Sequence, residues 1–236
     1  MKLKEYDVIV VGGGHAGCEA AHASAVLGCN VLLLTQNLET IARMSCNPAM
    51  GGVAKGQIIR EIDALGGASG IITDLSSIQF RMLNKSKGPA MWSPRAQCDR
   101  KIFEKEWRKK LESNKNIDFW QDTVEKLIIE NKIVKGVVTK MGTKIKGKSV
   151  ILCNGTFLNG IIHLGIKNYK GGRSGEPAAE GITKELINLG FKNGRMKTGT
   201  PPRLDGRSID FSKTEEQKGD KEKIKFSFLN YRKIKK

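Results

Sequence analysis

A glycine-rich turn near the N-terminus constrains the fold of this chain more than any other feature. Residues 8–11 form a β-branched apolar run that predicts a strand, and residues 20–27 form an alanine-rich run that predicts a helix. Between them stand Gly12, Gly13, Gly14, His15, Ala16 and Gly17. Residues 31–34 predict a second strand, which completes the βαβ unit in which a G-x-G-x-x-G sequence binds a dinucleotide.

Three glycines of this turn have separate physical reasons to lack a side chain. Gly12 permits a tight exit from the strand, Gly14 lets a pyrophosphate approach the backbone, and Gly17 lets the helix pack closely against the sheet. The free N–H groups and the positive end of the helix dipole then face the phosphates. We predict dinucleotide binding, with a purely structural glycine turn as the alternative. His15 is expected to shape the turn or meet the edge of a phosphate rather than to act as an acid or base.

The composition is that of a globular chain without a membrane span. The chain has 236 residues, 39% of them hydrophobic, and its apolar runs are far shorter than the roughly 20 residues that cross a bilayer. We expect a cytoplasmic protein. The five cysteines form no C-x-x-C pair and no metal-ligand spacing, so we expect no metal site and a reducing compartment. The net charge of +17 suits a polyanion such as nucleic acid, although a lysine-rich solvated surface gives the same count.

The rest of the chain alternates helical and extended patterns. Residues 36–53 read as a long irregular loop, and residues 55–65 predict a helix whose buried face carries Ile58, Ile59, Ile62 and Leu65. Residues 71–83 are ambiguous, residues 84–94 predict a loop, and residues 178–189 predict a helix. Residues 95–113 predict a helix with an inward stripe of Cys98, Ile102, Trp107 and Leu111.

An antiparallel meander is expected in the middle of the sequence. A short strand at residues 117–120 is followed by alternating runs at residues 123–129, 133–140 and 144–146, and then by an apolar strand at residues 150–153. This order predicts an α/β fold, a Rossmann-like FAD-binding domain of the two-dinucleotide-binding-domain flavoprotein type in which the meander replaces a crossover helix. We expect residues 1–200 to form the N-terminal part of that domain and residues 201–236 to begin an NAD-binding insertion domain.

One expected feature of the dinucleotide site is missing. An acidic residue usually ends the second strand and binds the ribose hydroxyls. Here that position falls in Thr35-Gln36-Asn37, and Glu39 is the nearest acid. A neutral side chain can still hydrogen-bond a ribose, and Glu39 is better explained as a solvated loop carboxylate.

Several ordered motifs extend over almost the whole chain, weakening after about residue 212. They are MSCNPAMGG (44–52), KG (55–56), EIDALGG (61–67), SKGPA (86–90), RAQCDR (95–100), GGR (171–173) and KTGTPPR (197–203). With the glycine turn, this series resembles the glucose-inhibited division protein A family, also called the GidA or MnmG family. The resemblance implies an FAD enzyme that works as a homodimer with a partner GTPase, MnmE. It also implies addition of an aminomethyl-type group to C5 of the wobble uridine of tRNA, with methylene-tetrahydrofolate as carbon donor and NADH as reductant.

The resemblance also assigns roles to individual residues. Gly12, Gly13, Gly14, His15, Ala16 and Gly17 are expected to bind the FAD pyrophosphate. Val124 matches the position whose backbone meets the adenine, and it would also serve as a core valine. Cys46 matches a cysteine implicated in function, as nucleophile or proton carrier, and an inert loop thiol is the alternative. Basic residues around Gly88 are expected near tRNA or the flavin, and ordinary solvated charge explains them equally well.

Family members are much longer than this chain, so its own activity is left open. A full member would continue through an NAD-binding domain, a further FAD-contacting segment and a helical domain that engages tRNA. The chain is therefore expected to be a truncated product, one half of a split enzyme or a fragment. Two other functions are weighed against the tRNA-modifying one. A small-molecule FAD oxidoreductase would need a redox cysteine pair or an intact substrate domain, and an inactive FAD-binding fragment would act only in binding or assembly.

Overall fold

The computed structural model describes residues 4–222 and 224–229, and the chain divides into two compact units. Unit 1 comprises Met1–Arg43 and Trp107–Arg195, and unit 2 comprises Met44–Glu106 and Met196–Lys236. The domain boundary expected at residue 200 stays a prediction. No helix within the described ranges has the length and apolar character that crossing a membrane requires.

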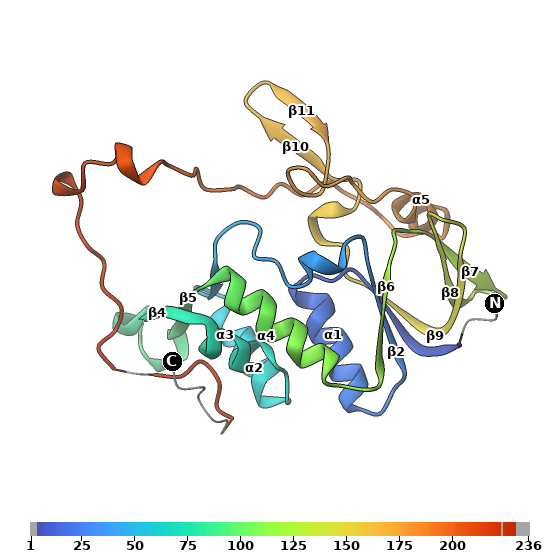
Figure 1. Cartoon of the computed structure of the whole chain (residues 1–236), viewed down its shortest axis with the longest axis horizontal. Coiled ribbons are helices and arrows are strands. Elements are labelled where there is room, and N and C mark those ends of the chain that lie inside the picture. The colour runs from blue at the N-terminus through green and yellow to red at the C-terminus, as the bar shows by residue number, and fades with distance from the viewer. Residues whose placement is uncertain (1–3, 223, 230–236) are drawn as a thin grey trace. The chain divides into compact units, whose positions relative to one another are not determined.

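Unit 1 is built on a six-stranded mixed sheet in the order β6-β2-β1-β9-β8-β7 (Figure 1). Strands β1 (Tyr6–Val11), β2 (Val31–Thr35), β6 (Ile117–Gln121) and the second half of β9 (Lys144–Leu152) pair in parallel. Strands β7 (Val124–Glu130), β8 (Ile133–Thr139) and the first half of β9 form the antiparallel meander. The predicted α/β fold with its Rossmann-like βαβ start and meander is therefore confirmed.

The apolar side chains of β1 and β2 are buried because α1 covers these strands. Helix α1 (His15–Val26) packs against the parallel strands, and α5 (Ile182–Asn188) packs against β7. The core joins Ile182 of α5 to side chains from both kinds of strand, which are Tyr6, Ile9, Val11, Leu32, Leu34, Val124, Val137 and Ile145. A separate two-stranded sheet pairs β10 (Ile161–Leu164) with β11 (Lys167–Lys170).

One prediction in this unit was wrong because two expected strands are a single strand. Residues 144–146 and 150–153 were expected to be separate, but β9 runs through both and changes partners at Gly147. A side chain at Gly147 would place its Cβ 2.7 Å from Cδ1 of Ile9, so the strand passes β1 without one. Lys148 and Ser149 interrupted the apolar pattern and concealed the continuity.

Unit 2 contains a three-stranded antiparallel sheet in the order β3-β5-β4 and two helices. Its elements are β3 (Ala49–Gly51), α2 (Gly56–Ala64), α3 (Ser69–Ser76), β4 (Ser77–Leu83) and β5 (Ser93–Cys98). The ambiguous residues 71–83 thus divide between α3 and β4, and residues 36–53 are less irregular than expected because they contain β3. Single 3-10 turns lie at Leu38–Thr40, Lys85–Lys87, Pro89–Met91, Gly155–Phe157, Gly206–Ser208 and Phe211–Lys213.

Two helix predictions need correction. Residues 95–98 belong to β5, and α4 (Arg100–Glu112) begins where the Asp99 carboxylate accepts hydrogen bonds from the N–H groups of Lys101 and Ile102. Its fully buried side chains are Phe103, Trp107 and Leu111, one residue out of step with the expected stripe at Ile102.

The buried face of α2 was also mispredicted. Ile58 and Leu65 are 55% and 90% exposed, whereas Asp63 is completely buried. The Asp63 carboxylate accepts a hydrogen bond from the N–H of Phe228 at 2.8 Å, and the buried ring of Phe226 lies against Gly51 of β3 and the ring of Phe80 of β4. Because the hydrogen bond to Asp63 comes from Phe228, far along the chain, local spacing could not reveal this face.

Candidate functional site

The glycine turn joins β1 to α1 at the carboxyl edge of the parallel strands of unit 1. Gly12 has a φ of +110°, and a Cβ there would lie 2.8 Å from the carbonyl carbon of Cys153, at the end of β9. A Cβ on Gly17 would lie 2.9 Å from the carbonyl carbon of Gly12 and closer still to its oxygen. Both positions therefore exclude a side chain for reasons internal to the fold, as the sequence predicted.

Gly14 is different because no protein atom restricts it. It is the N-cap of α1 with a φ of −77°, and a Cβ built there meets nothing within 4 Å. No side chain caps the helix and its first turn holds no acidic residue, so the first N–H groups of α1 are available to an anion. An exposed glycine without internal need, placed at a helix N-terminus, fits a pyrophosphate that approaches the backbone.

The edge that holds the turn also gathers the ends of the neighbouring strands. The N–H of Gly12 donates to the carbonyl of Leu34, and the N–H of Cys153 donates to the carbonyl of Val11. Gln36 follows the last residue of β2, and Asn154 lies two residues after the last residue of β9. Ligands of open parallel sheets bind at this edge, outside the carboxyl ends of the strands.

Two side chains at this edge have unused hydrogen-bonding atoms. The amide nitrogen and oxygen of Gln36 are both shielded from solvent, and neither has a hydrogen-bond partner in the part of the chain that is described. The amide oxygen of Asn154 is in the same state. Buried polar atoms normally have partners, so these atoms are suited to the hydroxyl groups of a bound nucleotide. The residues present therefore fit a dinucleotide.

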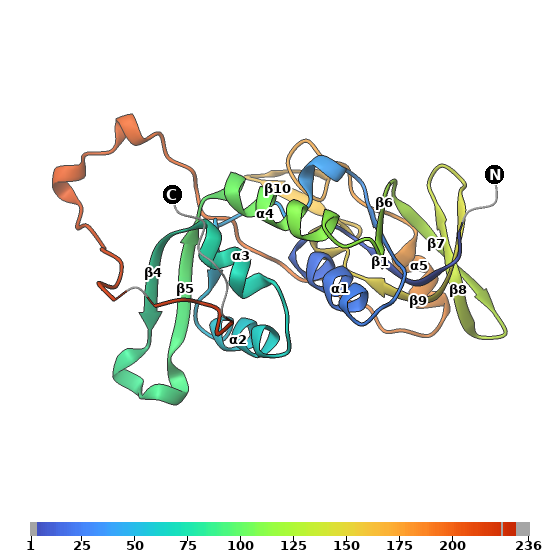
Figure 2. The same cartoon turned by 60° about the horizontal axis from the view of Figure 1, so that its bottom comes forward.

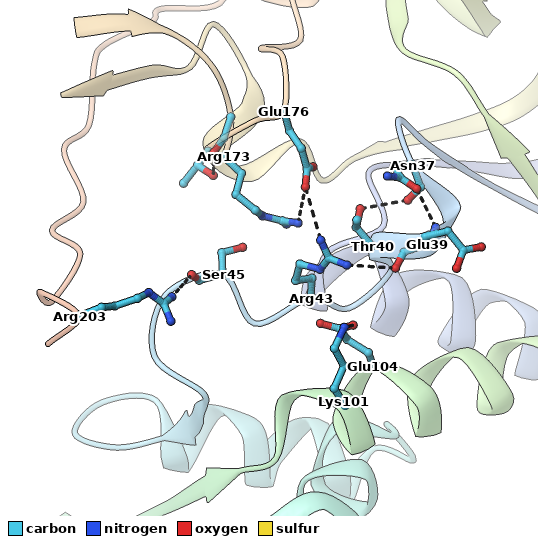
Figure 3. Close-up of polar contacts among 12 residues, drawn as sticks. Asn37, Glu39, Thr40, Arg43, Ser45, Lys101, Glu104, Arg173, Glu176 and Arg203 are labelled. Atoms are coloured by element: carbon cyan, nitrogen blue, oxygen red, sulfur yellow. Dashed lines mark hydrogen bonds and ion pairs between the residues drawn. The ribbon is translucent and has the colours of Figure 1, made fainter. Parts of the chain in front are cut away.

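Strand β2 ends at Thr35, so the residues that follow it, Gln36 and Asn37, are neutral. The Asn37 side chain accepts a hydrogen bond from the N–H of Glu39 at 2.8 Å, and this contact begins a 3-10 turn (Figure 3). The Glu39 side chain is exposed, as expected for a solvated carboxylate. Gln36 is better placed than Glu39 to contact the hydroxyl groups of a nucleotide, and the sequence could not show that its amide lacks a hydrogen-bond partner.

His15 lies in a partly buried setting beside a cationic group. Burial lowers the pKa of His15, and the positive charge of Arg173 lowers it further. Arg173 forms an ion pair with Glu176 at 3.0 Å, and Arg43 approaches the same carboxylate at 3.8 Å (Figure 3). The imidazole is therefore held in its neutral form near the glycine turn, which suits a hydrogen-bonding role better than acid–base catalysis.

Burial keeps two thiols near the glycine turn, those of Cys18 and Cys153, in their protonated form. Cys18 is fully buried in α1, and burial raises its pKa well above the ordinary range. Burial also raises the pKa of Cys153. Both thiols stay protonated at neutral pH, and we assign them packing roles.

Val124 opens the meander and lies in the core of unit 1. Its side chain is buried, and it pairs with Thr139 of β8. The predicted core role is therefore evident, and the predicted contact of its backbone with adenine stays a prediction.

Cys46 belongs to unit 2, in a loop that several motifs contact. The Cys46 thiol lies 3.8 Å from the carbonyl oxygen of Gly199. The backbone carbonyl of Cys46 accepts a hydrogen bond from the Arg100 guanidinium at 2.6 Å. Arg203 donates to the carbonyl of Ser45 at 3.2 Å (Figure 3). Motifs that are separated in sequence therefore meet at this loop. The thiol is half-buried, and its proposed chemistry is taken up below.

Across residues 4–222 and 224–229, no three His, Cys, Asp or Glu side chains gather closely enough to hold a metal ion.

The mixed sheet, its meander and the glycine turn place the chain in the class of proteins with the FAD-binding Rossmann-type fold. Sequence comparison gives the particular family. The chain belongs to the glucose-inhibited division protein A family, whose model matches residues 7–236.

Relatives and solved structures agree with this assignment. The chain is 64% identical over 97% of its length to the tRNA uridine 5-carboxymethylaminomethyl modification enzyme MnmG of Flavobacterium psychrophilum. It is 66% identical over 98% of its length to the protein of the same name in Karelsulcia muelleri. Aquifex aeolicus GidA superposes with a TM-score of 0.91 and 49% identity, covering 96% of this chain and 38% of that one. The chain spans 37% of the Flavobacterium protein and 38% of the Karelsulcia protein.

Proposed function

We propose that this chain is the FAD-binding part of an enzyme that adds an aminomethyl-type group to C5 of the wobble uridine in tRNA. The observation that carries the proposal is the pairing of the family match over residues 7–236 with a glycine turn in which Gly14 alone is unrestricted by the protein. The relatives named above are tRNA uridine modification enzymes. Their chemistry comes to this chain by that resemblance.

Within this function, each part of the chain has a defined task. Gly12, Gly13, Gly14, His15, Ala16 and Gly17 bind the FAD pyrophosphate, largely through the N–H groups at the start of α1. The backbone of Val124 meets the adenine. Bound FAD supplies redox chemistry, and Cys46 supplies a thiol that acts as nucleophile or proton carrier.

The remaining components follow from the family rather than from this chain's residues. They are NADH as reductant, methylene-tetrahydrofolate as carbon donor, the GTPase MnmE as partner, a homodimer as assembly and the cytoplasm as location. Residues 1–200 would form the N-terminal part of the FAD-binding domain, and residues 201–236 would begin the NAD-binding insertion. The net charge of +17 is compatible with a tRNA partner.

Reconstitution in trans tests the proposal. The chain is co-expressed, in cells lacking their own MnmG, with the polypeptide that follows the equivalent of residue 236 in the Flavobacterium psychrophilum relative. Nucleoside digests of tRNA are then analysed for modification at C5 of uridine. We expect modification with both polypeptides and none with either alone. Cys46→Ser should abolish it while leaving flavin absorbance unchanged. Absence of modification despite a soluble, flavin-loaded complex would contradict the proposal.

A further inference from the structure

The turn between β4 and β5 of unit 2 forms a rigid projection, which we name the hairpin tip (residues 84–92). The two strands pair up to Leu83 and Ser93, and the tip then folds into two consecutive 3-10 turns. The indole N–H of Trp92 donates to the carbonyl of Lys85 at 3.3 Å and closes the tip across its base. In Figure 2 the hairpin extends beyond α2 and α3 of the same unit.

This hairpin carries charge of one sign. Residues 75–98 contain four basic residues and no acidic one. They are Arg81, Lys85, Lys87 and Arg95. Lys85 forms an ion pair with Asp220 at 3.2 Å. Lys87 is exposed and forms no ion pair with any residue of the described ranges. The tip is therefore complementary to a polyanion.

The tip also presents an aromatic ring to solvent. Trp92 is 42% exposed and its neighbour Met91 is 47% exposed, although neither contributes to the core. The hydrogen bond to Lys85 fixes one edge of the indole, which reduces the entropy that a ligand would lose on stacking against its face. An exposed aromatic ring on the same tip as two lysines is an arrangement in which an unpaired base stacks on the ring while the backbone follows the cations.

We propose that the hairpin tip binds single-stranded RNA, with Trp92 stacking on a base and Lys87 contacting a phosphate. The inference deepens the proposed function and rests on it only in taking RNA as the substrate class. An anionic membrane is disfavoured because the exposed apolar residues of the tip form a single short run, Pro89 to Trp92, which is far smaller than the apolar face of a helix that lies in a membrane interface.

The test is a fluorescence titration of the full chain with a uridine-rich single-stranded RNA about ten nucleotides long. Trp107 is fully buried and Trp120 is partly buried, so Trp92 is the most exposed of the three tryptophans. We expect quenching that is absent in Trp92→Phe. Binding measured by anisotropy should weaken about tenfold in Trp92→Ala and much less in Trp92→Phe, because phenylalanine retains a stacking face. Lys87→Gln should reduce the salt dependence by about 0.7 in the log–log slope.

The control variant is Phe211→Ala, which removes another exposed aromatic side chain of unit 2 and should leave RNA affinity unchanged. Equal RNA affinity in the parent chain and Trp92→Ala would overturn the proposal. So would binding to phosphatidylserine vesicles that RNA cannot displace, which would favour a membrane surface. FAD titrations of the same variants separate the two claims, because normal FAD binding with no effect of Trp92→Ala would reject the RNA surface alone.

Discussion

Gly14 and Gly17 lie three residues apart in the same turn, yet the structure predicts opposite consequences for their replacement by alanine. At Gly14 the added Cβ meets no protein atom within 4 Å, and the φ of −77° is ordinary for alanine. At Gly17 the added Cβ lies 2.9 Å from the carbonyl carbon of Gly12 and closer to the oxygen. The first change leaves the protein intact and fills the space of the ligand, whereas the second disrupts the protein itself.

The magnitudes follow from these contacts. Alanine is a poorer N-cap than glycine by about 0.5–1 kcal/mol. Alanine also restricts the unfolded chain, which stabilises the folded state by about 0.4–1 kcal/mol. Because the two effects oppose each other, Gly14→Ala should change the free energy of unfolding by less than about 1 kcal/mol. Gly17→Ala should lower the free energy of unfolding by about 1–3 kcal/mol, because the new Cβ clashes with backbone atoms of Gly12, which cannot rotate away as a side chain could. That loss lowers the melting temperature by about 2–4 °C for each kcal/mol.

Two assays on each variant decide the matter. Thermal unfolding measures stability, and isothermal titration calorimetry measures the affinity for FAD. We expect Gly14→Ala to unfold near the parent temperature and to bind FAD at least about tenfold more weakly, a loss of about 1.4 kcal/mol. Gly17→Ala should unfold earlier. Parental FAD affinity in a folded Gly14→Ala variant would refute the placement of the pyrophosphate at this turn.

Three further predictions concern stability. Burial, together with the hydrogen bond to Asp118, raises the pKa of Tyr6 to about 12 from 10.0, so the folded state keeps a proton that the unfolded state loses. Stability should therefore fall as the pH rises from about 10 to 12, and urea unfolding of Tyr6→Phe should lack this slope. Asp74→Ala removes the acceptor of two N–H groups, those of Phe226 at 2.6 Å and Ser227 at 2.9 Å. It should destabilise unit 2 by about 1–3 kcal/mol per group left unpaired, and hydrogen exchange should show faster exchange at both amides. Trp107→Ala should cost about 3–5 kcal/mol in chemical denaturation, because the indole is fully buried, and a cost below about 1 kcal/mol would contradict this packing.

The parts of the fold that the sequence predicted correctly are those governed by local pattern. The β-branched run of β1 and the glycines after it determine a strand and a sharp turn without help from distant residues. The meander strands alternate in polarity because one side of each faces the core. For these elements, neighbouring residues alone carry the physical cause.

The errors occurred where distant partners decide the structure. Asp63 is buried because Phe228, 165 residues away, donates a hydrogen bond to it, and no periodicity within α2 records that contact. Strand β9 continues through Lys148 and Ser149 because its two halves pair with different neighbours. Asp99 was a readable N-cap signal that the helical spacing of Cys98 and Ile102 obscured.

The candidate site divides in the same way. The glycine turn was predictable because its glycines are explained by backbone geometry and by the start of α1. The buried, unpaired amide of Gln36 was not, because pairing is a property of the folded surroundings. The contacts of Cys46 with Arg100 and Gly199 likewise join motifs whose proximity only the fold establishes.

Binding of FAD compared with riboflavin tests the central claim most directly. Riboflavin has the same isoalloxazine ring but lacks the pyrophosphate and adenosine that the glycine turn and Gln36 are proposed to hold. Calorimetric titration of the parent chain should give FAD an affinity at least about a hundredfold higher, a difference of about 2.8 kcal/mol. Equal affinity for the two flavins, or no binding of FAD by the folded chain, would contradict the account.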